Sequence, residues 1–204
     1  MKKIMLNEER RQKTYMFLQP SRPVLITTLN EDGSTHVAPF SWVIPVSCNP
    51  PLVGLALFTK PEKQHSLENL ERHPEFTINV PGLDSAYHLV QCSYDFKAGI
   101  KRIDALNLAT SEAKKIKPLL IEECRAHLEC KVLTITPTGD HSLIIAEVII
   151  TSYEPTAYTP SLLLKVSQSP PCLHIGHYGN PDGQVHLFLA PSEVRIVEVP
   201  FPEL

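Results

Sequence analysis

The chain has 204 residues, including 19 prolines but only 8 glycines, and its formal net charge at pH 7 is -3. Proline therefore occurs at about twice its usual frequency of ~5%. Because proline removes a backbone donor and interrupts helices, this composition excludes a helical bundle. The charge lacks the basic excess that binding to phosphate backbones requires, so no nucleic-acid partner is expected.

Neither a signal peptide nor a membrane helix is predicted. The basic N-terminus reaches Glu8 and Glu9 before any apolar run of signal-peptide length. No stretch approaches the ~18 apolar residues of a membrane helix. The five cysteines have irregular spacing, which is typical of reduced thiols, most of them in the core. We therefore expect a cytoplasmic protein, folded as a single domain over residues 1–204.

The first half of the chain predicts strands and one short helix. After a short N-terminal segment that could be helical, residues 23–29 are β-branched and apolar, and residues 30–33 have turn chemistry. A return strand over residues 34–42 is interrupted by Pro39, which a strand tolerates at an edge or bulge. Further strands are expected at residues 52–58 and 75–80, separated by a helix over residues 66–72.

Helical potential is greatest between residues 83 and 117, including the polar stretch 112–117. Residues 124–135 and 143–150 then predict a long hairpin around the turn at residues 136–140. Shorter strands are expected at residues 162–166, 185–189 and 194–199. Many short antiparallel strands with turn signals indicate a mainly β fold, a closed barrel with a few helices.

Two proline-rich segments, residues 36–42 and 47–51, combine hydroxyl and aromatic side chains. Prolines leave some backbone donors and acceptors unpaired in a sheet, and these groups could meet a planar ligand with ring heteroatoms. A plain surface crossover between strands is the alternative.

Two further segments carry cations. Lys63, His65 and Ser66 lie where the helix over residues 66–72 begins, with Ser66 as a possible N-cap. Free N–H groups and the positive end of the helix dipole favour a monophosphate there. Residues 97–102 form a second cationic patch around a flexible glycine. The alternatives are an ordinary helix cap and a solvated loop.

Residues 172–177 include one cysteine and two histidines, both of which can bind zinc. A structural zinc site needs four convergent ligands, and no second cysteine or histidine pair accompanies this segment. A core cysteine and hydrogen-bonded histidines are therefore expected, and no metal site is predicted. No G-x-S-x-G segment supports a hydrolase.

Several segments in this order resemble the flavin reductase-like proteins with an FMN-binding split barrel, in particular the flavoredoxin branch. The matching segments are residues 22–28, 38–42, 45–53, 75–81, 97–100, 123–132, 139–141 and 174–176. The resemblance implies a Greek-key antiparallel split barrel with short helices over residues 20–180, preceded by an extension over residues 1–19. It also implies a homodimer with FMN near the dimer interface.

The resemblance further implies which residues bind FMN, and it implies no catalytic side chain and no metal ligand. The ring would lie against two segments, the phosphate would be held at the short helix, and a third segment would close over the flavin. In that order these residues are Ala38, Pro39, Phe40, Ser41, Trp42, Ser47, Cys48 and Asn49; Lys63, His65 and Ser66; and Lys97, Ala98 and Gly99. Residues 139–141 are interpreted as a structural turn.

This chain departs from the family pattern at two places. His36 stands where relatives often have asparagine, and Gln64, His65 and Ser66 replace a Lys-Asp-Thr sequence. The implied activity is electron transfer through FMN, from NAD(P)H to flavin or another acceptor. The alternatives are an electron carrier with a redox protein as donor, a non-catalytic FMN-binding protein, and an interaction protein that binds no flavin.

Overall fold

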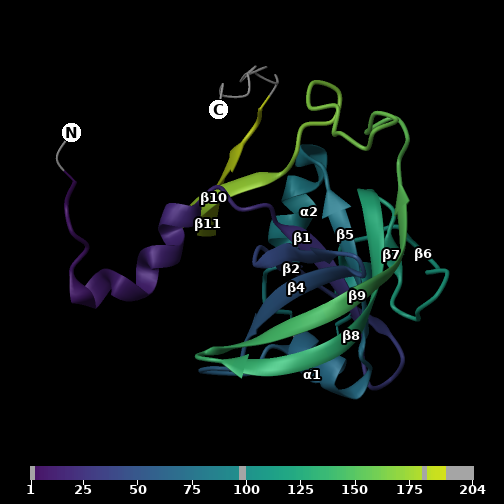
Figure 1. Cartoon of the computed structure of the whole chain (residues 1–204), viewed down its shortest axis with the longest axis horizontal. Helices are drawn as coiled ribbons and strands as arrows, with labels where there is room; N and C mark the ends of the chain where they lie inside the picture. Colours follow the sequence, from purple (N-terminus) through teal and green to yellow (C-terminus); the bar gives the residue numbers. More distant parts are fainter. Residues whose placement is uncertain (1–2, 97–99, 181–182, 192–204) are drawn as a thin grey trace, which may run out of the picture.

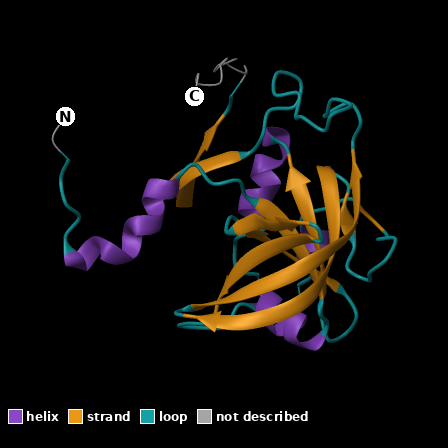
Figure 2. Cartoon of the chain, viewed as in Figure 1, coloured by secondary structure: helices purple, strands orange, loops and turns teal. Residues whose placement is uncertain are grey.

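Seven antiparallel strands form one curved sheet in the computed structural model, which describes residues 3–96, 100–180 and 183–191 (Figures 1 and 2). The strand order is β2-β1-β5-β8-β9-β4-β3, so β2 and β3 are its two edges. The strands are β1 (Val24–Leu29), β2 (Thr35–Phe40), β3 (Val43–Cys48), β4 (Pro51–Phe58), β5 (Glu75–Pro81), β8 (Cys124–Thr138) and β9 (His141–Tyr153).

Shorter elements surround this sheet. Two small two-stranded sheets are formed by β6 (Thr110–Ser111) with β7 (Leu120–Ile121), and by β10 (Leu173–Asn180) with β11 (Gly183–Leu189). The helices are α1 (His65–Arg72), α2 (Ala86–Gln91) and α3 (Arg102–Ala105), with 3-10 helices η1 (Glu8–Leu18) and η2 (Leu83–Ser85). No helix in these described parts is long and apolar enough to cross a membrane.

Strand β1 is buried on both faces and separates two hydrophobic clusters. Because side chains alternate along a strand, Val24 and Ile26 enter the interior of the curved sheet, whereas Leu25 packs outside it against α2. Leu67 and Leu70 of α1 join the inner cluster, so α1 closes the lower end of the barrel in Figure 2. The expected mainly β, antiparallel barrel with few helices is confirmed.

Most expected strands are present, and the long hairpin is longer than predicted. The sequence predicts no strand over residues 43–48, which form β3. Pro45 is tolerated because β3 is an edge strand, and its pairing with β4 is bulged between Pro45 and Ser47. Pro39 likewise lies within β2, at the other edge.

Two other expectations were wrong. Residues 112–117 are not helical, because the buried Glu129 carboxylate accepts the backbone N–H groups of Lys114 and Lys115 and holds them in a loop. Residues 162–166 are mostly irregular instead of a strand, apart from an isolated bridge between Leu164 and Tyr158, and Leu162 has φ 63°, a value that interrupts an extended backbone. Residues 194–199 lie outside the described residues.

The N-terminal helix η1 and the β10–β11 hairpin lie together to one side of the barrel (Figure 1). Backbone hydrogen bonds of 2.9 Å in both directions between Ser21 and His174 attach β10 to the segment that precedes β1. None of the residues of η1 is buried. The apolar side chains of this region are therefore uncovered within one chain.

Candidate functional site

An aromatic pocket of about 520 Å³ opens where β2, β4, the β8–β9 turn and η1 meet. The Trp42 ring stacks on the His141 ring, with centroids 4.6 Å apart and planes 18° apart, and the Phe58 ring lies 4.0 Å from the His141 ring. Its lining residues are Gln12, Tyr15, Pro39, Phe40, Ser41, Trp42, Ala56, Phe58, Gln64, Asp140 and His141. Pockets of this volume with aromatic walls are typical of small-molecule sites.

The turn between β8 and β9 places His141 in this pocket. Gly139 adopts a positive φ of 65°, which glycine takes without strain, and the chain reverses so that His141 pairs with Phe58 of β4. Asp140 Oδ1 lies 2.6 Å from His141 Nδ1, and since a carboxylate only accepts, Nδ1 donates. This hydrogen bond holds the pKa of Asp140 below its usual value and fixes the orientation of the imidazole.

The pocket also borders an unpaired strand edge. In the described sheet β2 pairs with β1 on one side only, so backbone groups along its other edge have no strand partner. Just beyond β2, the Trp42 carbonyl accepts a hydrogen bond of 3.1 Å from the Ala56 N–H. This bond fixes the backbone position from which the indole ring projects. A planar ligand with polar atoms along its rim fits such a combination of aromatic faces and free backbone groups.

A second, cationic pocket of about 590 Å³ lies beside the β1–β2 turn. Arg102 is fixed there by hydrogen bonds of 3.1 Å to the Val37 carbonyl and 3.0 Å to the Tyr94 carbonyl, and its guanidinium lies over the Phe96 ring. The lining residues are Asn30, Glu31, Asp32, Ser34, Thr35, His36, His65, Arg72, Phe96, Ile100, Lys101 and Arg102.

The first turn of α1 lies between the two pockets. Gln64, the N-cap of α1, lines the aromatic pocket, and its Oε1 accepts the Phe58 N–H at 2.8 Å. His65 lines the cationic pocket, with Nε2 2.8 Å from Asn30 Oδ1. The positive end of a helix favours anions. A ligand with a flat ring at one end and an anionic group at the other could therefore occupy both pockets.

His36 in the cationic pocket is neutral at physiological pH. Burial, with the nearby charge of Arg102 and the neighbouring His65, lowers the pKa of His36 to about 3. The His36 and His65 rings meet edge to face, with centroids 4.7 Å apart. The fixed positive charge in this part of the pocket therefore comes from Arg102 and not from His36.

The structure brings some of the predicted flavin contacts together. Pro39, Phe40, Ser41 and Trp42 line the aromatic pocket, and His65 lines the cationic pocket, whereas Ala38 packs against the inner core. These positions agree with a ligand site at the end of β2.

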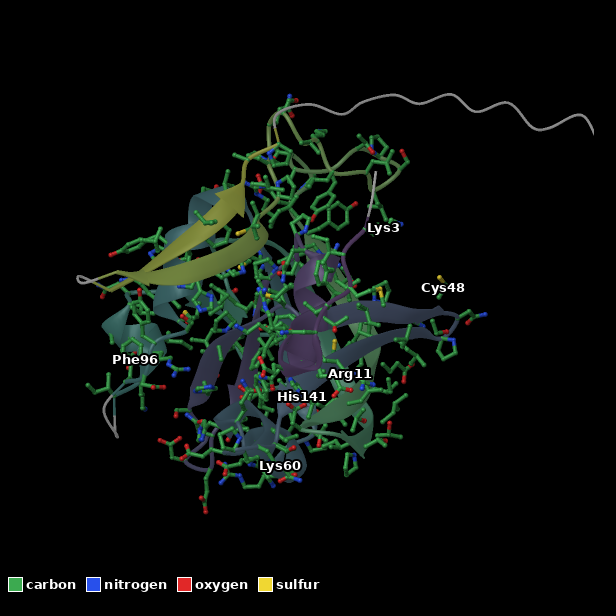
Figure 3. All side chains as sticks on the ribbon, turned by 90° about the vertical axis from the view of Figure 1, so that its left-hand side faces the viewer. Lys3, Arg11, Cys48, Lys60, Phe96 and His141 are labelled. Carbon is green, nitrogen blue, oxygen red and sulfur yellow. The ribbon has the colours of Figure 1, made fainter. Side chains whose placement is uncertain are left out.

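Other predicted contacts lie elsewhere in one chain. Ser47, Cys48 and Asn49 lie at the tip of the β3–β4 hairpin and line neither pocket. Figure 3 shows Cys48 apart from His141. Lys97, Ala98 and Gly99 lie outside the described residues.

The predicted phosphate contacts need one correction. Ser66 is not the N-cap, because α1 begins one residue earlier with Gln64 in that position, and the Ser66 side chain is buried in the first turn. Lys63 Nζ lies 2.8 Å from a Glu71 carboxylate oxygen instead of pointing into either pocket. The Lys63 and Glu71 side chains are 40% and 43% exposed.

His141, Phe58 and Arg72 are among the pocket residues that the sequence did not predict. His141 was assigned to a structural turn, which is correct for Gly139 but overlooks the imidazole in the pocket. Phe58 and Arg72 were treated only as parts of a strand and a helix. For His141 the Gly-Asp-His sequence was a usable signal. For Phe58 and Arg72 the sequence offers none, since their positions in the pockets depend on how the sheet curves.

The low pKa of His36 predicts a specific acid sensitivity. In the unfolded chain His36 would regain its ordinary pKa of about 6.5, so between that value and about 3 the unfolded state binds more protons. Stability contributed by neutral His36 is present above pH 6.5 and lost as the pH falls. From pH 6.5 to 4.5 the unfolding free energy should drop by about 2 kcal/mol more in the wild type than in His36→Gln.

Denaturant titrations at several pH values measure this difference, with His73→Gln as the control. Burial also lowers the pKa of His127, His174 and His186, so both variants keep a general loss of stability in acid. Parallel pH curves for the wild type and His36→Gln would contradict the assignment.

The comparisons with known proteins agree with this architecture. The profile described as "Flavin reductase like domain" matches residues 16–174. An uncharacterized protein of Archaeoglobus fulgidus is 32% identical over 133 residues, 65% of this chain and 72% of that protein.

Three solved structures share the fold at low identity. A putative flavin reductase with a split barrel domain from Shewanella frigidimarina has a TM-score of 0.74 and 16% identity, covering 98% of this chain and 100% of that one. A flavoredoxin from Methanosarcina acetivorans has a TM-score of 0.72 and 19% identity, covering 96% of this chain and 95% of that one. An FMN-binding protein from Thermus thermophilus with bound 1-cyclohex-2-enone has a TM-score of 0.76 and 15% identity, covering 97% of this chain and 100% of that one. The expected split barrel is thereby confirmed. The chain belongs to the flavin reductase-like family, whose members are flavin-related oxidoreductases.

Proposed function

We propose that this chain binds FMN and transfers electrons from NAD(P)H through it to free flavin or another acceptor. One observation carries the proposal: an aromatic pocket with unpaired backbone groups and a cationic pocket flank the same turn of α1. These two surfaces match the ring and the phosphate ends of one mononucleotide. The family assignment and the fold shared with an FMN-binding protein support the choice of ligand.

The side chains of the pocket would bind and orient the ring. Trp42 and His141 offer stacked faces, and aromatic contacts of this kind contribute about 0.5 to 1.5 kcal/mol each beyond the area they bury. The outer edge of β2 would hydrogen-bond the polar rim. FMN, when bound, supplies the hydride and electron chemistry, and the protein contributes its orientation and electrostatics.

The phosphate would lie at the first turn of α1. His65 and the cations of the cationic pocket face this place, and Lys63 lies just before the helix. Lys63 is paired with Glu71 on the surface, where such an ion pair stabilises the fold by only about 0 to 1 kcal/mol. Because so little energy holds Lys63 to Glu71, its ammonium group can turn towards a phosphate.

Lys63→Ala should weaken FMN binding about five- to tenfold while leaving riboflavin binding unchanged, because riboflavin lacks the phosphate. Fluorescence titrations with the two flavins measure both affinities. Lys131→Ala is the matched control, since Lys131 is also an exposed lysine paired with a glutamate, Glu75. Unchanged FMN affinity in Lys63→Ala would remove Lys63 from the phosphate site, and equal losses for both flavins would indicate general damage.

Electron transfer from a nicotinamide is tested under anaerobic conditions. Protein loaded with FMN is mixed with NADH or NADPH, and the visible absorption of the oxidised flavin is followed. Bleaching by at least one nucleotide, and recovery when free FMN or oxygen is added, is the expected result. Loaded protein that neither nucleotide reduces would contradict the proposed donor. Reduction by a redox protein would then indicate an electron carrier, and reduction by no donor a non-catalytic flavin-binding protein.

We also propose that two copies of the chain form a homodimer through η1 and the β10–β11 hairpin. Phe17 and Leu18 at the end of η1 are 74% and 81% exposed, and Leu187 and Leu189 of β11 are 44% and 41% exposed. Monomers rarely expose large contiguous apolar surfaces. A second copy of the same region would cover these side chains symmetrically.

Replacing Phe17 and Leu18 together by glutamate should convert a dimer into a monomer, because the charges would have to be buried in the contact. Light scattering after size-exclusion chromatography measures the mass in solution. The control replaces Leu162 and Leu163, which are similarly exposed in a different loop. A monomeric wild type, or a variant that stays dimeric, would contradict the proposed interface.

A further inference from the structure

Three histidines lie close together on one face of the β10–β11 hairpin, and none of them lines the aromatic or the cationic pocket. His174 and His177 are three residues apart on β10, a spacing that puts side chains on opposite faces of a regular strand. The register is shifted between His174 and Gly176, so Ile175 is an extra residue. This β-bulge brings His174 and His177 to the same face.

The third histidine comes from the neighbouring strand. His186 of β11 pairs directly with His177, and His174 pairs with Phe188, which is two residues after His186 and on the same face. The ring centroids are 5.2 Å apart for His177 and His186, 5.5 Å for His174 and His186, and 6.4 Å for His174 and His177. The cluster therefore depends on both the bulge and the hairpin register.

The nitrogen positions are close to those of a metal site. One ring nitrogen from each histidine can be chosen so that all three lie within 4.8 Å of one another, and His174 Nε2 is 3.4 Å from His186 Nδ1. With Zn–N bonds of about 2.0 to 2.1 Å, a tetrahedral ion holds its ligand nitrogens about 3.4 Å apart. One edge of such a tetrahedron is already in place, and small side-chain rotations would close the others.

We propose that His174, His177 and His186 bind one first-row divalent transition-metal ion, with a coordination position left for water. Three imidazoles without a carboxylate suit Zn²⁺, Ni²⁺ or Cu²⁺ and disfavour the hard cations Mg²⁺ and Ca²⁺. Bound metal would link β10 to β11 near Ser21, where the hairpin is attached to the barrel. Metal binding should therefore raise the thermal stability of this projecting region.

This site was discounted from the sequence because only residues 172–177 were considered as ligands. Cys172 is in fact a core residue, 1% exposed, and burial raises the pKa of its thiol to about 11, so it is not a ligand of this cluster. The third imidazole, His186, lies nine residues beyond His177. It is the register of the β10–β11 hairpin that places His186 opposite His177.

The test is a calorimetric titration of Zn²⁺ into untagged, chelator-treated protein, with Mg²⁺ as the comparison ion. We expect one Zn²⁺ per chain, no binding of Mg²⁺, and at least about tenfold weaker Zn²⁺ binding in His177→Ala and in His186→Ala. His73→Ala, which changes a histidine on α1's C-terminal side, is the control and should bind as the wild type does.

The wild-type titration alone can overturn the proposal, because a protein that binds no Zn²⁺ lacks the site whatever the variants do. Variants that bind Zn²⁺ as tightly as the wild type would place the ion elsewhere, for instance at the exposed Cys48 thiol. FMN content measured on the same samples separates this result from a failure of flavin binding, since the cluster does not line either flavin pocket.

Discussion

The pairing of β8 with β9 is the interaction on which the rest of the structure depends. These two strands lie at the centre of the sheet, with β5 on one side and β4 on the other, so the hairpin joins the two halves of the barrel. Its register is shifted at two places along β8, and such bulges increase strand twist and curvature. Without this hairpin, strands β2, β1 and β5 would not be joined to strands β4 and β3 around the inner core.

The same hairpin also positions the aromatic pocket. Its turn ends at His141, and pairing of β9 with β4 sets His141 opposite Phe58. Trp42, which follows the edge strand β2, stacks on the same imidazole. The pocket therefore brings the hairpin turn together with the edge strand β2 and with β4, and its shape depends on the curvature of the sheet.

The strands and the family could be predicted from the sequence because both depend on local patterns. Alternating apolar residues and turn chemistry marked β1, β4, β5 and most of the β8–β9 hairpin. Two of the prolines, Pro39 and Pro45, lie in the edge strands β2 and β3, where the missing N–H group interrupts no hydrogen bond between inner strands of the sheet.

Side-chain contacts between distant parts of the chain could not be predicted in the same way. Glu129 lies 15 residues after Lys114 and belongs to no recognisable motif, so the sequence does not identify it as the group that holds residues 114 and 115 out of a helix. His141 and His186 acquire their neighbours through strand register, which is a property of the folded sheet. The ion pair between Lys63 and Glu71 could not be predicted either, since it depends on the distance between the two side chains in the folded protein.

The visible absorption spectrum of the purified protein shows whether the two pockets beside α1 hold one flavin mononucleotide, as we propose. After incubation with FMN and removal of the excess by desalting, we expect the two-banded spectrum of oxidised flavin, at one FMN per chain. A colourless protein that retains no FMN after this treatment would rule out binding in these pockets.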